Sequence, residues 1–345
     1  MSIARRDFRL RSGAALSFST LGFGAAPIGN MHRRLEEEEA AATVESAWAA
    51  GMRYFDTAPL YGHGLSERRV GAALREKPRD EFVVSTKVGR LLEPCAPGEE
   101  EAGIYKETPQ VRVRFAYSYD AVMRSFEESL SRLGLGRIDI LYVHDVDALT
   151  HGNDEAADAR IGELLDTGGW RALDELRSTG AVAAIGAGVN TVRACERLLE
   201  LADPDIFLLA GRYTLLDQSA AVRLLPACVE RGVAVVLGGP YNSGILATGP
   251  VPGAWYDYEA APEPILARAR RLQEVCERHD VPLARAALHF PLSHPAIVSV
   301  IPGSQTRAEV ERNVATFTDP PPAALWRELA GEGLITSEAA AALGA

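Results

Sequence analysis

The stretch Leu21-Gly22-Phe23-Gly24-Ala25-Ala26-Pro27 decides between two architectures for this chain. It contains the end of the first β-rich run, residues 20–24. An open, doubly wound sheet predicts a G-x-G-x-x-G turn at this point, continuing directly into a helix. Here a proline follows the glycines and no helix start is visible. The stretch therefore argues against the open sheet.

Seven further β-rich runs follow, and helical patterns alternate with them. We predict strands at 20–24, 53–56, 82–87, 139–144, 182–186, 206–210, 233–237 and 298–301. The predicted helices cover 36–50, 66–75, 119–133, 169–178, 192–201, 219–230, 265–278, a segment after Pro282, and 307–315. Strands joined by helices are parallel, because the helix makes the crossover. Eight such units close into a TIM (β/α)8 barrel, which is the predicted fold.

The predicted barrel has additions at both ends and on one rim. We expect an N-terminal β-hairpin, a barrel core at about 18–316 and a C-terminal helical tail at 317–345, all in one domain of residues 1–345. Residues 90–117, rich in Pro, Gly, Glu and Arg, read as a long rim loop, and long loops in compact domains are usually functional. The alternative for the N-terminus is a twin-arginine export signal at Arg5-Arg6-Asp7-Phe8, but glycines and a proline break the apolar stretch behind it.

Composition limits the possible partners. The 345 residues carry 47 acidic and 36 basic side chains, a formal net charge of -11, which argues against nucleic acid because phosphate binding needs a basic face. No apolar run reaches the roughly 18 residues of a membrane-spanning helix. The four cysteines lack zinc-ligand spacing, so we expect reduced thiols, no metal and a cytoplasmic protein. We expect a monomer or a small homo-oligomer.

Four polar residues lie at or just beyond the carboxyl ends of predicted strands. Asp56, Lys87 and His144 each close a strand, and Tyr61 lies in the loop after the second strand. Each alone has an ordinary explanation, because strand-end charges are often solvated, loop tyrosines often pack and histidines after apolar runs are often structural. In a barrel, however, the ends of neighbouring strands converge, and catalytic residues lie there.

The chemistry of hydride transfer explains this set. A hydride added to a carbonyl leaves an alkoxide that needs a proton, and a free tyrosine has a pKa near 10, too high for an efficient proton shuttle. A buried ammonium beside the phenol would lower that pKa. The ammonium needs a carboxylate partner to remain charged when buried. We therefore predict that Asp56 holds Lys87, that Lys87 lowers the pKa of Tyr61, and that His144 orients the carbonyl.

The same residues carry a resemblance to a known family. The run from Phe55 to Gly62, reading FDTAPLYG, followed by Ser66-Glu67, resembles the signature of the aldo-keto reductase family. The run Ser85-Thr86-Lys87 and the strand ending at His144 are also similar, and the similarity covers residues 21–313. It implies a TIM barrel, a nicotinamide cofactor and a catalytic tetrad of Asp56, Tyr61, Lys87 and His144.

Within the family, several sequence stretches resemble those of D-threo-aldose 1-dehydrogenases, a group that includes L-fucose and D-arabinose dehydrogenases. The same stretches are similar to those of pyridoxal 4-dehydrogenase. These stretches cover residues 21–30, 144–147, 211–217 and 301–305. The resemblance implies oxidation of the C1 hemiacetal of an aldose to a lactone, with Tyr61 accepting the hydroxyl proton. Three alternatives stay open: a pyridoxal 4-dehydrogenase, an NADPH-dependent aldehyde or ketone reductase, and a non-catalytic nicotinamide-binding regulatory subunit.

The resemblance also implies where the cofactor binds. The expected contacts are Gly24, Ala25, Asp56, Asn190, Gly238, Gly239, Ser243, Gly303, Ser304, Gln305, Arg307, Glu309 and Asn313. NADP-selective relatives place basic residues where this chain has Gly303, Gln305 and Glu309, and a carboxylate near the ribose repels a 2′-phosphate. We therefore expect NAD, although Arg307 and Arg312 lie nearby. Where many relatives stack a tyrosine on the nicotinamide, this chain has Gly238, with Tyr241 three residues later.

The substrate is expected to meet side chains from the rim loops. Besides Tyr61 and His144, the candidates are Leu60, Arg90, Asp145 and Trp255. Asp145 can accept hydrogen bonds from sugar hydroxyls or cap a helix, and Trp255 can stack on a ligand or pack on its own loop. The sequence leaves the individual substrate and the physiological direction open.

Overall fold

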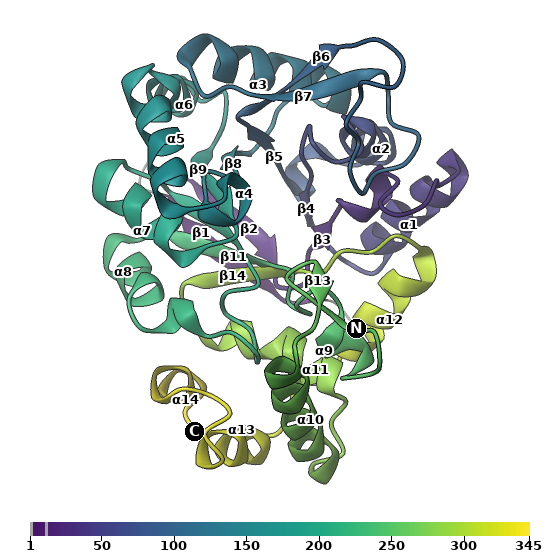
Figure 1. Ribbon diagram of the computed structural model, residues 1–345, viewed down its shortest axis with the longest axis vertical. Helices are drawn as coiled ribbons and strands as arrows, with labels where there is room; N and C mark the ends of the chain where they lie inside the picture. The colour runs from purple at the N-terminus through teal and green to yellow at the C-terminus, as the bar shows by residue number, and fades with distance from the viewer. Residues whose placement is uncertain (1–2, 11–12) are drawn as a thin grey trace.

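A parallel eight-stranded sheet forms the centre of the molecule (Figure 1). The structure is a computed structural model and describes residues 3–10 and 13–345. The strands run in the spatial order β14-β11-β10-β9-β8-β5-β4-β3. Their bounds are β3 (Phe23–Gly24), β4 (Tyr54–Asp56), β5 (Val83–Val88), β8 (Ile140–His144), β9 (Ala184–Val189), β10 (Ile206–Ala210), β11 (Ala234–Gly238) and β14 (Ile297–Ile301).

The two edge strands meet and close the sheet into a barrel. Parallel bridges join Leu21 to Val300 and Gly24 to Gly303. The Gly22 amide donates to the Val300 carbonyl at 2.9 Å, and the Val300 amide donates to the Thr20 carbonyl at 2.9 Å. A Cβ on Gly22 would lie 2.9 Å from the side chain of Ile301, so closure requires glycine there. The predicted TIM barrel is confirmed.

Helices surround the barrel, one after almost every strand (Figure 1). They are α1 (Glu37–Ala49), α2 (Leu65–Leu74), α3 (Tyr119–Leu133), α6 (Gly169–Ser178), α7 (Val192–Leu201), α8 (Leu224–Arg231), α10 (Glu263–Arg278), α11 (Leu283–His289) and α12 (Arg307–Phe317). The continuous helix predicted at 219–230 is wrong. A short 3-10 turn covers Ser219–Ala221, and α8 begins only at Leu224 because Pro226 is tolerated in a helix only within its first turn.

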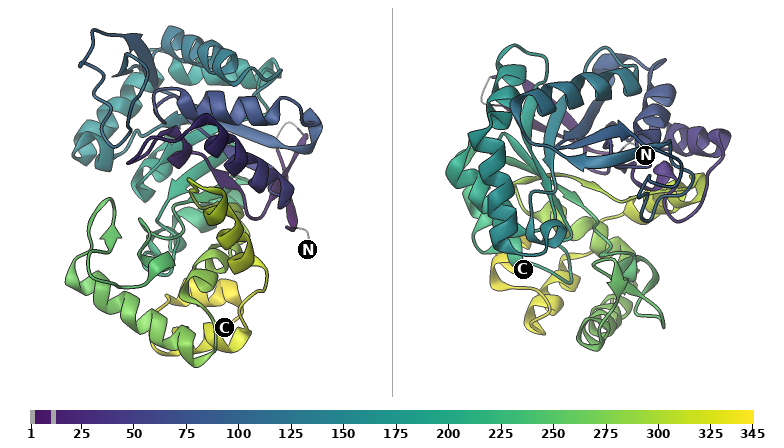
Figure 2. Two further views of the ribbon diagram at one scale, coloured as in Figure 1. Left: turned by 90° about the vertical axis from the view of Figure 1, so that its right-hand side faces the viewer. Right: turned by 45° about the horizontal axis from the view of Figure 1, so that its top comes forward.

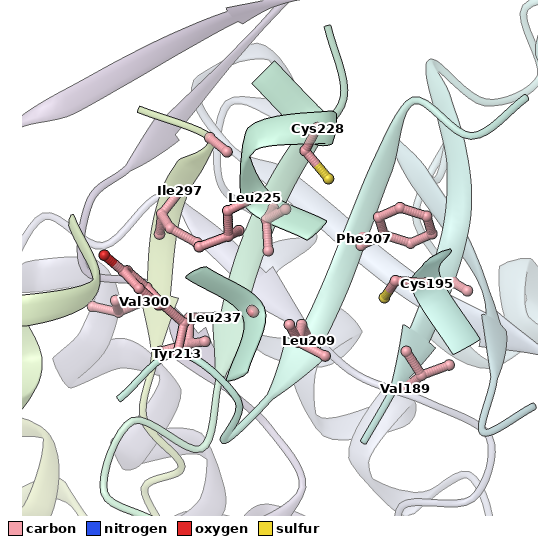
Figure 3. Close-up of a cluster of buried hydrophobic side chains, with 14 of the residues drawn as sticks. Val189, Cys195, Phe207, Leu209, Tyr213, Leu225, Cys228, Leu237, Ile297 and Val300 are labelled. Atoms are coloured by element: carbon pink, nitrogen blue, oxygen red, sulfur yellow. The ribbon is translucent and has the colours of Figure 1, made fainter. Parts of the chain in front are cut away.

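Buried apolar side chains fill the space between the barrel and its helices. Figure 3 shows part of this layer, where Phe207, Leu209 and Leu237 from the strands face Cys195, Leu225 and Cys228 from α7 and α8. All four cysteines are free thiols, and Cys195 and Cys228 serve here as small apolar side chains.

A second, inner cluster lies within the barrel and leads up to the polar strand ends. It includes Tyr54, Val83, Ile140 and Tyr142. Alternate residues of a strand share one face, so the inward rows that start with these residues continue to Asp56, Lys87 and His144. The period of the strands therefore turns these three side chains toward the barrel axis at its carboxyl end.

The N-terminal hairpin closes the opposite end of the barrel. It pairs β1 (Arg5–Arg9) with β2 (Ala15–Ser19), and residues 11–12, between the two strands in sequence, lie outside the described part. Phe18 belongs to the inner cluster and meets the Tyr54 ring edge-on at 5.1 Å. The pair Arg5-Arg6, which in sequence resembles part of a twin-arginine export signal, lies in β1. Arg6 donates a hydrogen bond to the carbonyl of Leu292 at 3.2 Å.

The rim insertion is more ordered than the sequence analysis expected. Residues 90–117 were interpreted as a loop, but they contain an antiparallel hairpin of β6 (Arg90–Pro94) and β7 (Val111–Phe115). The alternating order Val-Arg-Val-Arg-Phe in β7 is a strand pattern that the loop-rich composition concealed. A smaller ribbon, β12 (Trp255–Tyr256) with β13 (Glu259–Ala260), follows β11. Figure 2 (left) shows both ribbons on the side of the barrel opposite the N-terminal hairpin.

Further helices lie outside the strand–helix repeat. The connection after β8 contains α4 (Ala148–His151) and α5 (Asp154–Asp166), which were not predicted, and Asp147 and Asn153 cap their N-termini. The C-terminal tail forms α13 (Ala323–Gly331), followed by α14 (Ser337–Leu343), and α13 is tied to α10 by the Arg278–Glu328 pair at 2.6 Å. In the described residues, no helix is both long and apolar enough to cross a bilayer.

Candidate active site

A cavity of about 840 Å³ opens at the carboxyl end of the barrel. Every barrel strand contributes a residue to its wall: Gly24, Asp56, Lys87, His144, Gly188, Ala210, Gly238 and Ile301. This is the end at which barrel enzymes carry their catalytic groups. The cavity is therefore the candidate active site.

A buried ion pair lies at the bottom of the cavity. The Lys87 ammonium donates to Asp56 Oδ2 at 2.7 Å and to the Thr57 carbonyl at 2.8 Å, and the exposed fractions of the two charged side chains are 1% and 3%. Ser85 donates to the other oxygen of Asp56 at 2.7 Å. Burial raises the pKa of Asp56, while Lys87 and Ser85 act in the opposite direction. The predicted juxtaposition of Asp56 and Lys87 is present.

Tyr61 stands above this pair because two glycines allow the loop to turn closely. A Cβ on Gly62, whose φ is +64°, would collide with the Gly29 carbonyl, so the two segments of the chain need glycine where they touch. The Lys87 ammonium lies 4.7 Å from the centre of the Tyr61 ring, over its face. The His144 ring meets the Tyr61 ring edge-on at 5.8 Å.

The pKa of Tyr61 shifts opposite to the sequence-based prediction. Tyr61 keeps part of its surface open to the cavity, yet the surrounding protein removes enough water to raise its pKa well above the usual value, and the carboxylate of Asp56 adds to this rise. The Lys87 charge cannot reverse the shift because it is already paired with Asp56. In this state the phenol is protonated at neutral pH.

His144 is neutral for a related reason. Burial lowers its pKa well below the usual value, and the cations of Arg90 and Lys87 lower it further. Its Nδ1 is buried without a hydrogen-bond partner among the described residues. Its Nε2 lies 3.4 Å from Asp145 Oδ2. A neutral imidazole at this place can donate one hydrogen bond to a substrate oxygen.

The predicted cofactor contacts divide into two groups. Gly24, Asp56, Asn190, Gly238, Gly239, Ser243 and Gly303 line the cavity, whereas Ala25, Ser304, Gln305, Arg307, Glu309 and Asn313 do not. Two of the second group lie directly behind the wall: the hydroxyl of Tyr241, a lining residue, donates to Asn313 at 2.9 Å, and Asn313 donates to Ser304 at 3.0 Å.

Of the remaining cofactor candidates, Gln305, Arg307 and Glu309 lie at the N-terminus of α12, whereas Ala25 directly follows β3 and its amide donates to the Asp56 carbonyl at 2.9 Å. Thr306 caps this helix, and Glu309 accepts the Gln305 amide at 2.6 Å. Arg307 is exposed and pairs with Glu311 at 2.7 Å. Arg33, which the sequence analysis did not consider, donates to Gln305 at 3.1 Å and is paired with Glu39.

The cavity fits a nicotinamide dinucleotide in shape and in chemistry. A Cβ on Gly188 would lie 3.1 Å from Lys87, and one on Gly238 would lie 3.1 Å from Leu208, so a larger side chain at either position of the lining would crowd its neighbour. The apolar side chains of Leu208 and Ile301 suit the face of a planar ring. The volume lies within the usual range for cofactor sites, and Asn190 can supply amide hydrogen bonds.

The predicted substrate contacts also divide. Asp145 and Trp255 line the cavity, but Leu60 and Arg90 do not. Arg90 instead binds Asp145, with Nη2 2.6 Å from Oδ2, and both side chains are largely buried. A contact between Arg90 and bound substrate is therefore not supported, because the Arg90 guanidinium is already paired with Asp145.

Tyr258 is a cavity residue that the sequence analysis missed. It lines the mouth with Trp255, and the exposed fractions of these residues are 62% and 54%. Asp257 and Tyr258 have φ of +48° and +65°, as in a type I′ turn, a conformation that disfavours tyrosine. The Asp257–Arg212 pair at 2.9 Å and a hydrogen bond of 3.0 Å from the Tyr258 amide to Ser243 hold the turn in place. The run Trp255-Tyr256-Asp257-Tyr258, with three aromatic residues around one aspartate, was the available signal.

Comparison with known proteins agrees with this geometry. The chain matches the model of the aldo/keto reductase family over residues 20–329. It is 41% identical to a pyridoxal 4-dehydrogenase from Microbacterium luteolum, over 97% of this chain and 100% of that protein. It is 42% identical to a D-threo-aldose 1-dehydrogenase from a Pseudomonas species, over 94% of this chain and 97% of that protein. The resemblance inferred from the motifs is confirmed.

A solved structure agrees at the level of the fold. An aldo-keto reductase from Bacillus halodurans, in its holo form, superposes with a TM-score of 0.72 at 24% identity. The superposition covers 99% of this chain and 96% of that chain.

Proposed function

Because the chain belongs to the aldo/keto reductase family and is an oxidoreductase that uses a nicotinamide cofactor, we propose that it oxidises the C1 hemiacetal of an aldose to a lactone, with NAD as the hydride acceptor. The observation that carries this proposal is the convergence of Asp56, Tyr61, Lys87 and His144 at the bottom of one cavity. An aldose similar to L-fucose or D-arabinose is the proposed substrate, in line with the relative named D-threo-aldose 1-dehydrogenase.

In this proposal each of the four residues acts on the C1 oxygen or on another member of the set. His144, kept neutral by burial, donates a hydrogen bond that holds the C1 oxygen. Tyr61 accepts the proton of the C1 hydroxyl as the C1–O bond gains double-bond character. Lys87 places a positive charge over the face of the Tyr61 ring, and Asp56 orients that ammonium through a hydrogen bond of 2.7 Å.

The raised pKa of Tyr61 bears on the direction of the reaction. In the protein alone the phenol is protonated, which suits donation of a proton to an alkoxide during carbonyl reduction. When bound, oxidised nicotinamide takes up the hydride and adds a positive charge that favours the phenolate. We therefore propose that Tyr61 acts as a base only with oxidised cofactor present.

The charges around Gln305 support NAD over NADP. Two carboxylates lie there, since Glu309 accepts the Gln305 amide at 2.6 Å and Glu39 binds Arg33, which also contacts Gln305. Arg33, the cation that contacts Gln305, is thus already paired with a carboxylate. Negative charge at this place disfavours a 2′-phosphate and suits a free ribose hydroxyl.

A second candidate substrate is pyridoxal. The mouth of the cavity presents the exposed rings of Trp255 and Tyr258, which can stack on an aromatic pyridine as well as on the apolar face of a sugar ring. A relative 41% identical to this chain is named pyridoxal 4-dehydrogenase. The carboxylate of Asp145 in the wall favours the aldose, because it can accept hydrogen bonds from ring hydroxyls.

A cofactor-reduction assay tests the proposal. Purified protein is mixed with NAD or NADP and with L-fucose, D-arabinose, L-galactose or pyridoxal, and the appearance of reduced cofactor is followed. We expect reduction of NAD with at least one aldose. Turnover only with pyridoxal selects the second candidate, and turnover confined to a parallel assay that follows the loss of NADPH with an aldehyde or ketone selects a carbonyl reductase. Cofactor binding without any turnover would support a regulatory subunit.

A further inference from the structure

We propose that Arg90 and Asp145 form a positioning pair that fixes the side-chain amide of Asn190 toward the carboxamide of the bound nicotinamide. This inference rests on the proposed function, because it concerns the same cofactor site. It assigns to Arg90 and Asp145 a role in cofactor binding, which is separate from the hydrogen bond that Asp145 can accept from a sugar hydroxyl.

The amide of Asn190 lies between two carboxylates. Its Nδ2 donates to Asp145 Oδ1 at 3.0 Å and to Asp147 Oδ2 at 3.0 Å. An ionised carboxylate only accepts hydrogen bonds, so the NH2 group must face both of them. The amide oxygen is then the polar group that Asn190 can offer to the cavity that it lines. A carboxamide NH2 is the matching donor.

Two carboxylates so close to one amide repel each other, and each needs a stabilising partner. Asp147 is fully buried and receives the backbone amides of Thr150 at 3.0 Å and Asn190 at 2.6 Å. Asp145 receives the charge of Arg90 at 2.6 Å. The other nearby arginine, Arg212, donates to the Asn190 carbonyl at 2.7 Å, and its guanidinium pairs with Asp217 and Asp257. Arg90 is thus the cation that pairs with Asp145 and holds its carboxylate in place.

The contacts around Arg90 and Asp145 hold both residues in place. Asp145 has φ of +52°, a left-handed conformation that is uncommon outside glycine and that aspartate tolerates better than most residues. Its amide donates to the Gly188 carbonyl at 2.9 Å, which anchors this conformation to β9. The Arg90 guanidinium stacks on the Phe115 ring at 4.5 Å, across the β6–β7 ladder. The hairpin inserted after β5 therefore holds the Arg90 guanidinium beside Asp145, a residue that lines the cofactor cavity.

The test compares two cofactors that differ at the carboxamide. Full-length protein is titrated with NADH and with the reduced 3-acetylpyridine analogue, which carries a methyl group in place of the NH2 donor, and both dissociation constants are measured by fluorescence. For the unmodified protein we expect NADH to bind roughly three- to tenfold more tightly, the value of one hydrogen bond. In Asp145→Asn and Arg90→Met the preference should fall to about twofold or less, because the amide is then free to turn.

Controls separate positioning from general damage. Arg177→Met breaks another Arg–Asp pair, to Asp205 at 2.9 Å near the amino end of β10, and should lower stability without changing the preference. Arg90→Lys keeps the charge and should restore most of the preference, which keeps the test valid if Arg90→Met does not fold. Folded Asp145→Asn and Arg90→Met with an unchanged preference would overturn the positioning pair. Unmodified protein that binds neither NADH nor NADPH would instead overturn the proposed function itself.

Discussion

The ammonium of Lys87 lies over the face of the Tyr61 ring, 4.7 Å from its centre, while it donates hydrogen bonds to Asp56 and Thr57. The cation therefore acts on the phenol through the π face of the ring and through space. Burial outweighs this effect and raises the pKa of Tyr61. The chemistry proposed for Tyr61 thus depends on the charge of what occupies the cavity.

Tyr61→Phe removes the proposed proton-transfer group and nothing else. We expect kcat to fall by roughly 100-fold or more, the usual contribution of general acid–base catalysis, while the dissociation constant for NADH stays within about twofold. Steady-state kinetics and fluorescence titration measure the two quantities. Tyr105→Phe is the matched control, because its ring lies 6.5 Å from that of Tyr61. A near-normal kcat in Tyr61→Phe would refute the role.

Lys87→Met should destabilise the protein by about 3–5 kcal/mol, because Asp56 is left buried without its cation. Adding Asp56→Asn to this variant removes the uncompensated charge and should recover much of the stability but none of the activity. Denaturant unfolding of the two single variants and the double variant gives the coupling energy. Additive losses in the double variant would show that the ion pair is not the source of the instability.

Tyr258→Gly separates stability from substrate binding. It converts the Asp-Tyr turn into Asp-Gly, a favoured type I′ sequence, so we expect a gain of about 1 kcal/mol in the free energy of unfolding. The lost ring should raise KM for the sugar or pyridoxal substrate several-fold and leave the affinity for NADH unchanged. Tyr256→Phe, in the same ribbon, is the control. An unaltered KM would remove Tyr258 from the substrate site.

Acidification should destabilise the protein through its buried histidines. Burial lowers the pKa of His144 well below its usual value, so between these two values the unfolded chain binds a proton that the folded chain excludes. Stability is therefore complete above the unfolded pKa of about 6.5 and declines below it. His144→Gln should flatten the decline between pH 6.5 and 5 by at most about 1.4 kcal/mol per pH unit. Equal slopes for both proteins would contradict the shift.

Glu309→Gln tests the preference for NAD. Removing one carboxylate beside Gln305 should improve NADPH affinity relative to NADH by roughly tenfold or less, as expected for one partly screened charge. Titration with both reduced cofactors gives the ratio. Glu311→Gln, on the same helix and paired with exposed Arg307, should leave the ratio unchanged. An equal effect of the two substitutions would indicate general electrostatics instead of a ribose contact.

The sequence predicted the barrel and the four residues at its carboxyl end because both depend on local order. Alternate residues of a strand face one side, so Asp56, Lys87 and His144 had to point inward once their strands were recognised. The β6–β7 hairpin and the helices α4 and α5 were missed because charged and loop-forming residues obscure their periodicity.

What the sequence alone determined is the succession of strands and helices, and with it the ring of strands that brings distant polar residues to one end. Only the tertiary structure decided that Arg90 binds Asp145, that Tyr258 stands at the mouth and that the pKa of Tyr61 rises. The physical reason is that chain periodicity acts over a few residues. Ion pairing, exclusion of water and the placement of a loop depend on which remote segments pack together.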